Sequence, residues 1–573
     1  MEEIKLMHSL KDMINIRFDK FKDRVAFLEK FGTSKEFEEI TYKKLKDDIN
    51  GLGTYMLKKM GLENKKIAVI GENSSRWYIT YMAVVCGVGV IVPLDKELPA
   101  NEILNLMQRS KASAIVYSDR KKEAIDAIRD KLPKDMIYIN MNIPEKTKNE
   151  YSFDRLVEAG RDLVDTGNID YIEKEIDREA FSVLLFTSGT TGTSKGVMLN
   201  HKNLANNLYA AEFIIPQMGE YRLLSVLPMH HTFEFTVTYL FGTYSGSTIG
   251  ICEGLKYFVK NIKEIKPDVL VCVPALVERV DQRIEKALKE QNKEKLVSTM
   301  RKLTTGLSKI GIDLRKKVFK QIQDNLGGNV KIILCGGAPI DAKLVEKMES
   351  YGFIFMQGYG LTETAPLITA TLLKDRVAGT VGKPIKNMEV RIDLSANVDE
   401  NSNIGEIIVK GDNVMMGYYE NEEETNKVLN KGWFFTGDIG YFDIKGNLVI
   451  SGRSKNVIVT SNGKKIFPEE IENLINQIPL VEESMVYGKP SKKNKNEVLV
   501  TARVTLDEEY IEENYASKRP TDEEIYNIIW NEIKKINRSM VGYKAVKELE
   551  IKKDKFSKTT TMKIKRFEEM KKK

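Results

Sequence analysis

Short apolar runs alternate with helix-like segments over the first part of the chain. Between about Thr41 and Ser118, strands are predicted at Ile67–Ile70, Val90–Val92 and Ala114–Tyr117, with helical patterns between them. Runs of β-branched and apolar residues bounded by polar stretches are typical of strands. Because strands that alternate with helices favour a layered sheet, we predict an α/β fold.

The alternation resumes beyond a polar stretch from Met141 to Glu179. In the lysine-rich segment Glu278–Gly328, apolar residues recur at every fourth position and predict helices. We interpret these helices as a solvated pair packed on the body, because no heptad pattern of a coiled coil is sustained. Further buried strands are predicted at Val183–Phe186, Val197–Leu199, Leu223–Leu227 and Asp268–Val273.

The pattern changes after Ile392 to short strands with turns, as at Gly405–Gly411, and predicts a β-rich lobe. A break near Gly452–Lys455 separates this lobe from a small α/β unit. Within that unit, Thr521–Glu524 has the pattern of a capping box, which predicts the start of a helix there.

Two uncharged runs, Trp77–Leu94 and Phe235–Cys252, approach the length of a membrane span, which needs about 20 residues. Both are interrupted by glycine, proline or small polar residues, so we predict a buried helix followed by a strand in each. The N-terminus lacks the apolar core of a signal peptide, and we therefore expect a cytoplasmic protein.

Composition narrows the classes of function. The 573 residues are 42% hydrophobic and 30% charged, as in soluble globular proteins, and a net charge of +7 does not suggest nucleic-acid binding. Residues 541–573 contain twelve basic and five acidic residues. We interpret this tail as a solvated terminus; the alternative is peripheral contact with anionic lipid at the inner membrane face.

The cysteines lie in apolar surroundings without the C-x-x-C spacing of metal or redox motifs. With only four histidines in addition, the sequence does not predict a transition-metal cluster. Reduced core thiols are predicted at Cys86, Cys252, Cys272 and Cys335.

The most distinctive stretch is the loop Thr187–Gly196, which is rich in Gly, Ser and Thr and contains Lys195. Glycines let a ligand approach the backbone, and exposed N–H groups, hydroxyls and a cation suit a polyphosphate. The spacing is not that of a Walker A loop, because glycine follows the lysine where a hydroxyl residue would hold magnesium. The loop predicts binding of nucleotide phosphates, with a flexible surface turn as the alternative.

Five further stretches carry polar chemistry in apolar contexts. In chain order, the first offers bare glycine backbone for a flat ring, and the second offers an aromatic face beside a hydroxyl and a carboxylate. The third offers one carboxylate after a turn for sugar hydroxyls, and the fourth and fifth each offer a group of cations. Each of them alone could equally be a plain turn or a solvated face. They are Leu334–Pro339, Gln357–Thr364, Phe434–Asp438, Ser451–Lys455 and Thr559–Arg566.

Taken together and in this order, these stretches resemble the adenylate-forming superfamily of acyl-CoA synthetases, luciferases and peptide-synthetase adenylation domains. The signatures Thr187–Gly192 and Tyr359–Glu363 carry the resemblance, which covers essentially the whole chain. Leu227–Glu234 is similar to the long-chain fatty acyl-CoA synthetase branch, as are the insertion Glu278–Gly328 and the ending Thr561–Arg566.

The resemblance implies a large N-terminal adenylation domain of layered α/β sheets plus a β-rich lobe over residues 1–452. It also implies a small, mobile C-terminal α+β domain over residues 453–573, with a hinge at Lys455. Hinges are a few residues at element ends that absorb the change in backbone angles. Ser461–Lys465 would be the loop presented for the second step.

The implied reaction joins a long-chain or medium-chain fatty acid to coenzyme A. ATP and the acid give acyl-AMP and pyrophosphate, and thiolysis by coenzyme A then gives acyl-CoA and AMP. One alternative is an acyl-AMP ligase that loads a carrier-protein thiol. Another is a non-catalytic nucleotide- or lipid-binding protein, because fold does not fix function.

The resemblance also implies which residues bind the nucleotide. The loop from Thr187 to Lys195 would hold the β- and γ-phosphates, Tyr359 would stack on adenine, and Asp438, supported by Arg453, would bind the ribose hydroxyls. The implied binding positions are Thr187, Ser188, Gly189, Thr190, Thr191, Gly192, Lys195, Gly336, Gly337, Ala338, Gln357, Gly358, Tyr359, Gly360, Asp438, Arg453 and Lys455.

Four residues are implied in catalysis. Glu363 would hold Mg²⁺, which prefers carboxylate and phosphate oxygens, and Thr362 would touch the α-phosphate. Lys563 matches the lysine that bridges the carboxylate and the α-phosphate, although Met562 replaces the glycine more common before it; Lys565 is the competing candidate. His231 would act as a gate near the carboxylate and thiol path. Its neighbour His230 is interpreted as packing.

Overall fold

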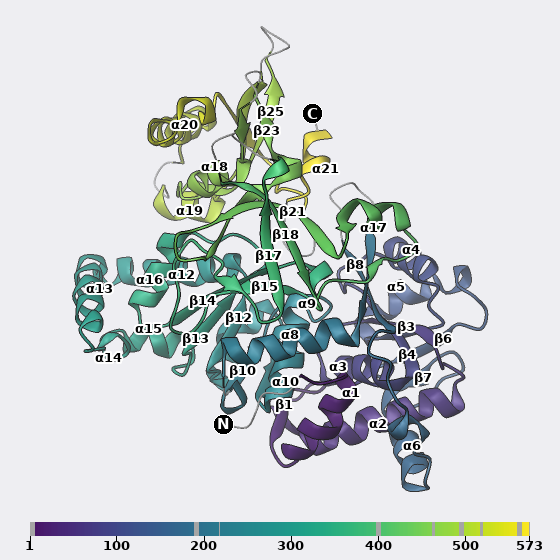
Figure 1. Cartoon of the computed structure of the whole chain (residues 1–573). Helices are drawn as coiled ribbons and strands as arrows, with labels where there is room; N and C mark the ends of the chain where they lie inside the picture. Colours follow the sequence, from purple (N-terminus) through teal and green to yellow (C-terminus); the bar gives the residue numbers. More distant parts are fainter. Residues whose placement is uncertain are drawn as a thin grey trace. The chain divides into compact units, whose positions relative to one another are not determined.

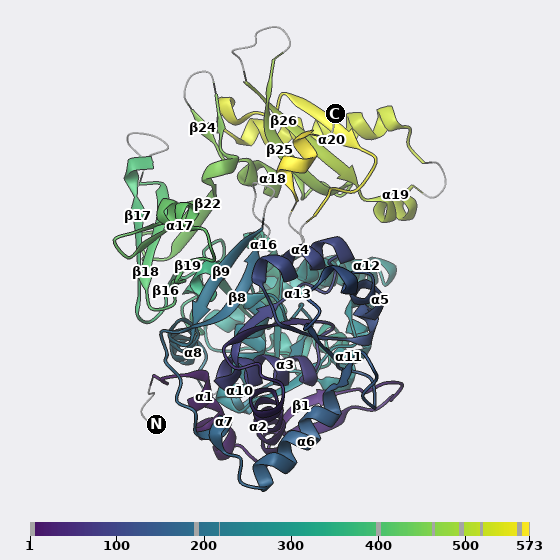
Figure 2. The ribbon, with the colours of Figure 1, turned by 90° about the vertical axis from the view of Figure 1, so that its right-hand side faces the viewer.

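The computed structural model describes residues 6–187, 194–216, 218–396, 403–460, 464–491, 498–515, 519–558 and 564–571. Within these ranges the chain forms two compact units (Figures 1 and 2). Unit 1 comprises residues up to 187, 194–389 and 410–429, and unit 2 comprises 390–409 and 430–573. The boundary between domains 1–452 and 453–573 stays a prediction.

One sheet of unit 1 has eight strands in the order β19-β9-β8-β4-β3-β5-β6-β7. Its centre is parallel, and β8 and β9 form an antiparallel pair that borders the predicted phosphate loop. The predicted strands in this region are confirmed. The strands are β3 (Lys65–Ile70), β4 (Gly89–Pro93), β5 (Ala114–Tyr117), β6 (Ile137–Asn140), β7 (Tyr151–Ser152), β8 (Phe181–Thr187), β9 (Lys195–Asn200) and β19 (Gly417–Tyr418).

The other sheet of unit 1 has nine strands in the order β16-β15-β14-β13-β12-β10-β11-β1-β2. From β1 to β14 the inner pairs are parallel, so the carboxyl ends of β13 and β14 meet at one edge, where ligands of open α/β sheets bind. The strands are β1 (Val25–Glu29), β2 (Glu38–Thr41), β10 (Arg222–Ser225), β11 (Thr248–Ile251), β12 (Val269–Cys272), β13 (Ile332–Cys335), β14 (Ile354–Gly360), β15 (Leu367–Ala370) and β16 (Lys383–Pro384).

Helices surround these sheets. They are α1 (Leu10–Asp12), α2 (Tyr42–Lys59), α3 (Ser75–Ala83), α4 (Ala100–Ser110), α5 (Lys122–Asp126), α6 (Phe153–Asp165), α7 (Asp170–Glu173), α8 (His201–Ile214), α9 (Thr232–Glu234), α10 (Phe241–Ser245), α11 (Phe258–Ile265), α16 (Ala342–Ser350) and α17 (Glu422–Val428). Helix α6 lies in the stretch that the sequence pattern shows only as polar, and it packs alongside α2 (Figure 2). The contact is close because both partners are glycines: a Cβ on Gly160 would lie 1.9 Å from the carbonyl oxygen of Gly51.

The two uncharged runs have the predicted structure. The first is α3, a π-helical turn and β4, and the second is a π-helical segment (Phe235–Leu240), α10 and β11. Among the described residues, no helix combines the length and the apolar character that crossing a membrane requires. The four cysteines are buried free thiols, as predicted.

The lysine-rich insertion is helical, as predicted, but it forms four helices rather than a pair. It lies at the left margin of unit 1 in Figure 1. Val280, Ile284, Val297 and Met300 pack against the core that the nine-stranded sheet shares with α11 and α16. Its helices are α12 (Pro274–Glu290), α13 (Glu294–Lys309), α14 (Arg315–Val318) and α15 (Lys320–Asn325).

Unit 2 contains the predicted β-rich lobe and a small α/β unit. The lobe is a five-stranded sheet, and the small unit packs helices on the strands β25, β26 and β27. The predicted capping box at Thr521 and Glu524 is confirmed at the start of α20. The elements are β17 (Met388–Asp393), β18 (Gly405–Gly411), β20 (Leu429–Asn430), β21 (Trp433–Phe442), β22 (Leu448–Arg453), β23 (Ile458–Val459), β24 (Lys465–Ile466), α18 (Pro468–Ile475), β25 (Val481–Pro490), β26 (Val498–Leu506), α19 (Glu508–Asn514), α20 (Asp522–Ser539), β27 (Glu548–Lys552) and α21 (Arg566–Lys571).

Candidate active site

Bare backbone lines the carboxyl end of β13 in unit 1. Gly337 has φ +83°, a left-handed conformation that favours glycine. A Cβ on Gly336 would lie 3.1 Å from the Phe233 ring and 3.2 Å from the carbonyl oxygen of Gly358. The predicted Gly336, Gly337 and Ala338 therefore follow β13 directly beside the end of β14.

The end of β14 is fixed by its neighbours. The Gln357 side chain donates to the carbonyl oxygen of Thr380 (2.9 Å), so its amide serves the fold of this edge. A Cβ on Gly360 would lie 1.7 Å from the Pro366 carbonyl oxygen, because the chain turns back sharply into β15. Tyr359, between Gly358 and Gly360, is mostly buried.

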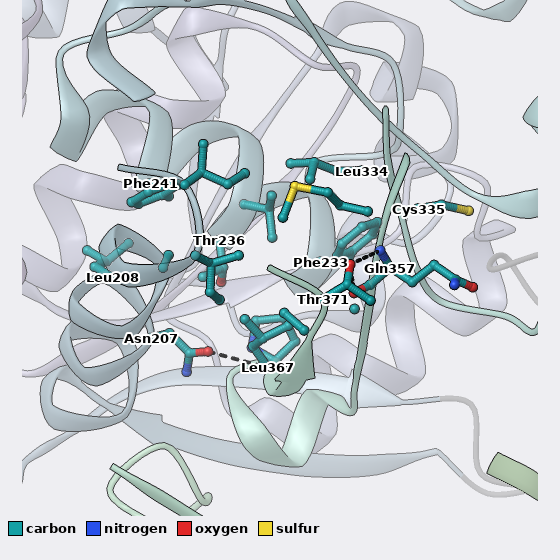
Figure 3. Close-up of a pocket in the computed structure, with 18 residues that line it drawn as sticks. Asn207, Leu208, Phe233, Thr236, Phe241, Leu334, Cys335, Gln357, Leu367 and Thr371 are labelled. Atoms are coloured by element: carbon teal, nitrogen blue, oxygen red, sulfur yellow. Dashed lines mark hydrogen bonds between the residues drawn. The ribbon is translucent and has the colours of Figure 1, made fainter. Parts of the chain in front are cut away.

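Thr362 and Glu363 lie in the short 3-10 turn Thr362–Thr364 that follows β14. Asn207 of α8 braces this turn: its amide donates to the Thr364 carbonyl oxygen (3.2 Å) and accepts from the Leu367 backbone N–H (3.0 Å; Figure 3). The Met415 backbone N–H donates to the Glu363 carbonyl oxygen (2.8 Å). The turn is thus held from two sides.

Tyr418 joins Glu363 to Lys195. Its hydroxyl donates to Glu363 Oε1 (2.9 Å), and Lys195 Nζ lies 4.8 Å from the centre of its ring. The pairing of β19 with β9 brings these residues together, since Tyr418 is the register partner of Val197. A predicted metal ligand and a predicted phosphate ligand thus contact the same side chain.

Lys195 also forms an ion pair with Glu424 at the start of α17. Glu424 Oε1 lies 2.7 Å from Lys427 Nζ as well. Hydrogen bonds first from Lys195 and then from Lys427 lower the pKa of Glu424 to about 2. The carboxylate is therefore ionised at neutral pH and offsets the charge of Lys195.

Arg109 contacts the stem of the phosphate loop, which is formed by Thr187 at the end of β8 and by Ser194 and Lys195, where β9 begins. Its guanidinium donates to the hydroxyl (2.9 Å) and the carbonyl oxygen (2.7 Å) of Ser194, and it lies 5.2 Å from the centre of the Phe186 ring. On the other side of the stem, the Thr187 hydroxyl donates to the Lys195 carbonyl oxygen (3.4 Å). The predicted Ser188, Gly189, Thr190, Thr191 and Gly192 lie outside the described residues.

His231 lies in the turn between β10 and α9, and Asn73 holds this turn with its whole side chain. Asn73 Nδ2 donates to the Ser225 hydroxyl (2.9 Å) and to the Leu227 carbonyl oxygen (2.7 Å), and its Oδ1 accepts from the Met229 N–H (3.0 Å). Because Asn73 follows β3 in the eight-stranded sheet and Ser225 ends β10 in the other sheet, it connects the two.

His230 packs against His231 with ring centres 4.0 Å apart, and its Nε2 lies 3.4 Å from Asp95 Oδ2. The contact with Asp95 adds a polar neighbour to the packing role interpreted from the sequence. Since Asp95 follows β4, this contact is a second connection from the turn to the eight-stranded sheet.

A fully buried carboxyl group lies behind the same turn. Glu234 accepts hydrogen bonds from the hydroxyls of Ser225 (2.7 Å) and Thr238 (3.0 Å). The hydroxyl of Tyr239 donates in turn to Ser225 (2.7 Å). Burial raises the pKa of Glu234 to about 8, which outweighs the lowering effect of these hydrogen bonds.

In unit 2, Arg453 Nε lies 2.7 Å from Asp438 Oδ1. Asp438 was expected after a turn, and this expectation is wrong: it lies inside the continuous strand β21, opposite Arg453 of β22. The irregularity is a bulge, because Gly437 has φ +72° and the register against β18 shifts there. Lys455 lies in the exposed 3-10 turn Ser454–Asn456 that follows β22.

Lys563 lies outside the described residues, but the chain just after it is anchored within unit 2. Arg566 Nη2 donates to both carboxylate oxygens of the buried Glu472 on α18, and Nη1 donates to the Val486 carbonyl oxygen (2.9 Å). Lys565 Nζ lies 3.0 Å from Glu568 on the surface.

An apolar cavity of about 600 Å³, counting its open mouth, lies within unit 1 (Figure 3). The polar side chains on its wall have partners in the protein: Thr236 donates to the Ala365 carbonyl oxygen, and Thr371 accepts from the Gln357 N–H. The side chains of Asn207 and Gln357 also line the wall, with the partners described above, and the rest of the wall is apolar. The wall includes Leu208, Ala211, Ile214, Ile215, Phe233, Val237, Phe241, Leu334, Met356, Gly358 and Leu367.

Except for Gln357 and Gly358, these lining residues were not predicted as site residues from the sequence, and neither were Tyr418, Glu424, Arg109 and Asn73. Each belongs to an ordinary helix, strand or turn, and its importance depends on contacts with residues far away in the sequence. The apolar character of α8 and of the π-helical segment Phe235–Leu240 was the available signal for the cavity, but it indicates burial in general.

The carboxylate of Glu363 fits a magnesium ion that arrives with a nucleotide. Mg²⁺ is usually held by one or two carboxylates together with phosphates and water. Across the described ranges, no group of three or more His, Cys, Asp or Glu side chains is arranged to hold a metal ion.

Replacing Glu234 with Gln should change how stability depends on pH. Because the folded-state pKa lies above the ordinary carboxyl value, the stabilisation from Glu234 is complete below about pH 4.5 and is lost as the pH rises through about 8. Between about pH 5 and about pH 8, the unfolding free energy of the wild type should fall relative to Glu234→Gln, by at most about 1.4 kcal/mol per pH unit. Denaturant unfolding of both proteins measures this difference.

Glu423→Gln is the matched control, since the Glu423 side chain is 82% exposed. Burial lowers the pKa of His201 to about 4, so this residue makes the unfolding free energy rise with pH below about pH 6.5. Because His201 is present in all three proteins, its effect cancels in the comparison. Parallel curves for the wild type and Glu234→Gln would contradict the assignment of a raised pKa to Glu234.

Comparison with known proteins agrees with this arrangement. A family model described as "AMP-binding enzyme" matches residues 15–419, and one described as "AMP-binding enzyme C-terminal domain" matches residues 455–572. The chain is 30% identical over 476 residues to long-chain-fatty-acid–CoA ligase 5 of Rattus norvegicus, covering 79% of this chain and 69% of that protein. It is 28% identical over 466 residues to long-chain-fatty-acid–CoA ligase FadD15 of Mycobacterium bovis, covering 78% and 74%.

The fold is shared with solved structures. The crystal structure of the anthranilate CoA ligase AuaEII in complex with anthranoyl-AMP matches with a TM-score of 0.77 at 18% identity, over 99% of this chain and 97% of that chain. This likeness confirms the predicted α/β fold class. With a family model that spans most of its length, the chain belongs to the AMP-binding enzyme family, as the signatures around Thr187 and Glu363 predict.

Proposed function

We propose that this protein is an ATP- and Mg²⁺-dependent ligase that joins a long-chain or medium-chain fatty acid to coenzyme A. The observation that carries the proposal is the apolar cavity, whose wall includes Gly358, one residue from Tyr359 and five from Glu363. The relatives named long-chain-fatty-acid–CoA ligases support the same substrate class.

The cavity suits an alkyl chain. Its wall consists mainly of apolar side chains with a few polar groups among them, which is the usual lining of a small-molecule site. Because the polar side chains on its wall are engaged with the protein's own backbone, they offer little to a polar ligand. Each methylene of a fatty acid that enters adds apolar contact worth about 0.8 kcal/mol.

Neutralisation of charge is the main task of the first half-reaction. A carboxylate must attack the α-phosphate of ATP, so two anions have to approach each other. We assign Lys195 and the Thr187–Gly192 loop to the β- and γ-phosphates and Thr362 to the α-phosphate. Glu363 would hold Mg²⁺, which when bound neutralises phosphate charge.

Tyr418 and Arg109 would act as positioning residues in this step. The Tyr418 hydroxyl fixes one oxygen of Glu363, and its ring supports Lys195, which limits the orientations of both charged groups. Arg109 holds Ser194 at the stem of the phosphate loop. Such bracing keeps a reacting geometry in place before the substrates arrive.

The remaining nucleotide and thiol roles rest on the family resemblance. We assign Tyr359, with the backbone of Gly336, Gly337 and Ala338, to adenine, and Asp438, with Arg453, to the ribose hydroxyls. His231 would border the path of the carboxylate and the thiol. The residues assigned to the remaining binding positions are Gln357, Gly358 and Gly360.

We also propose the domain boundary after residue 452, with the hinge at Lys455. The C-terminal family model begins at residue 455, which supports this position. Lys563 would bridge the carboxylate and the α-phosphate in the first step. The anchoring of Arg566 on Glu472 supports Lys563 over Lys565, because it fixes the chain three residues after Lys563, whereas Lys565 is paired with Glu568.

Pyrophosphate release with ATP, Mg²⁺ and a graded panel of fatty acids, with and without coenzyme A, tests the proposed function. We expect sustained turnover that needs both a long-chain or medium-chain acid and coenzyme A. Release limited to a single turnover in the presence of coenzyme A would favour a carrier-protein thiol as the acceptor. An absence of release with every acid would favour a non-catalytic binding protein.

Replacing Lys563 with Ala should abolish adenylation and spare ATP binding. The loss of a cation that stabilises developing charge lowers the rate by about a hundredfold or more. Rapid-quench measurement of acyl-AMP gives the rate, and equilibrium dialysis gives ATP affinity, which should change by less than about threefold. Lys565→Ala is the matched control and should retain adenylation; a reversed result would move the catalytic role to Lys565.

Replacing Glu424 with Gln should lower the KM for ATP. The carboxylate competes with the nucleotide for Lys195, and a pair of this exposure is worth up to about 1 kcal/mol, or about fivefold in KM. Steady-state kinetics at saturating fatty acid and coenzyme A measures the change. Glu423→Gln, which removes a carboxylate paired only with Lys427 among the contacts described, should leave KM unchanged. An unchanged or raised KM in Glu424→Gln would show that Glu424 orients Lys195 for ATP.

A further inference from the structure

We propose that the outer face of α13 and the loop after it bind an anionic membrane surface. This face comprises Leu296, Leu303, Ile310, Ile312 and Leu314 with the lysines beside them. The inference goes beyond the proposed function, and it rests on that function only in so far as fatty acids partition into membranes.

The inner face of α13 is committed to the core of unit 1. Val297 and Met300 pack against the hydrophobic core, and Thr304 is almost fully buried. Arg301 donates to the Ser350 hydroxyl of α16 (2.6 Å), and its guanidinium lies 5.2 Å from the centre of the Tyr351 ring. Leu296 and Leu303, which border this buried face at about 40–60° around the helix from Met300, are exposed.

The outer face carries large apolar side chains where a solvated helix would carry polar ones. Leu296, Leu303 and Ile310 recur at intervals of seven residues, so they lie on one stripe, and they are 60%, 55% and 72% exposed. Ile312 and Leu314 continue the exposed apolar run into the loop. A Cβ on Gly306, between Leu303 and Ile310, would meet no atom within 4 Å, so this stripe is open.

Lysines form a second stripe beside the first. Lys295, Lys302 and Lys309 each precede one of the three stripe residues directly, and all three are exposed. Over residues 293–318 the chain has eight basic and two acidic residues. Apolar side chains next to a dense row of cations are typical of helices that lie in the interface of an anionic bilayer.

This pattern favours a membrane over a second copy of the chain. An isologous dimer through α13 would bring two strongly basic faces together, and like charges oppose that contact. An anionic bilayer offers phosphate groups to the lysines and an acyl boundary to the leucines. In Figure 1, α13 and α14 lie at the edge of unit 1, consistent with access from outside.

Co-sedimentation of the full-length protein with vesicles tests the proposal, without ATP or coenzyme A. We expect binding to vesicles that contain phosphatidylglycerol, weak binding to phosphatidylcholine alone, and release as salt is raised from about 0.05 M to about 0.5 M. The variant Leu296→Ser, Leu303→Ser, Ile310→Ser should lower the partition coefficient by about tenfold or more. Thermal unfolding checks that it remains folded.

A matched control replaces exposed apolar residues elsewhere in unit 1: Ile16→Ser, Ile169→Ser, Leu255→Ser, whose exposed fractions are 59%, 41% and 60%. This control should bind vesicles like the wild type. Equal vesicle binding by the wild type and the α13 variant would overturn the proposal. So would a loss of binding confined to Lys571→Glu, Lys572→Glu, Lys573→Glu, which would assign the membrane contact to the basic tail.

Two further measurements separate membrane binding by α13 from self-association through the same face and from the proposed ligase function. A wild-type dimer that the α13 variant converts to a monomer, in sedimentation equilibrium without lipid, would identify the face as a self-association surface and overturn the proposal. With detergent-solubilised fatty acid, the α13 variant should retain the wild-type ligase rate. Vesicle binding by a protein without ligase activity would refute the proposed function and support the docking surface.

Discussion

The pairing of β19 with β9 is the constraint on which the charged centre of unit 1 depends. The strand is only Gly417–Tyr418, yet hydrogen bonds continue on both sides of it, from the Met416 N–H to Met198 (3.0 Å) and from the Tyr419 N–H to Gly196 (2.7 Å). Successive side chains of a strand point to opposite faces, so a slip of one residue would turn Tyr418 away from both Lys195 and Glu363. The short α17 that follows, capped by Asn421, presents Glu424 to the same lysine.

Buried polar groups give the turn at His231 a comparable rigidity. Asn73 uses both its donor and its acceptor on this turn, and Glu234 is surrounded by hydroxyl groups that can adjust to either of its protonation states. A buried carboxyl is costly unless it is hydrogen-bonded or neutral, and here burial favours the neutral form. The turn is therefore fixed by directional bonds that connect the two sheets of unit 1, and this suits a residue assigned to a substrate path.

The parts of this molecule that could be predicted from its sequence are those set by local pattern. The strands β8 and β9, the glycines after β13 and the capping box at Thr521 each depend on neighbours within a few residues. Tyr418 and Glu424 could not be predicted, because their roles depend on residues far from them in sequence. Asp438 is an intermediate case. The sequence identifies the residue and the glycine before it, and that glycine predicts a turn. In the structure, Gly437 with its positive φ forms a bulge within the strand β21.

The helix α13 shows that a sequence pattern can predict a helix without predicting which of its faces is buried. It lies in the insertion that was predicted to be helical from the periodicity on either side of it, but that periodicity does not say which face of α13 is buried, and the heptad stripe of Leu296, Leu303 and Ile310 is exposed. Val297 and Met300, each displaced by one or more positions from that stripe, make the contacts with the core.

The separation between charged and apolar surfaces has a consequence for specificity. Lys195, which is assigned to phosphate, is held by an ion pair with Glu424, and a ligand that leaves such a group unpaired loses much affinity. The cavity discriminates only by fit, at about 1–3 kcal/mol per methylene. The protein should therefore be strict about the nucleotide and the carboxylate and tolerant of chain length up to the length that the cavity can hold. Under the proposed function, that limit would be set by side chains from α8, the π-helical segment and α10, and these are the elements that a change of chain-length preference would alter first.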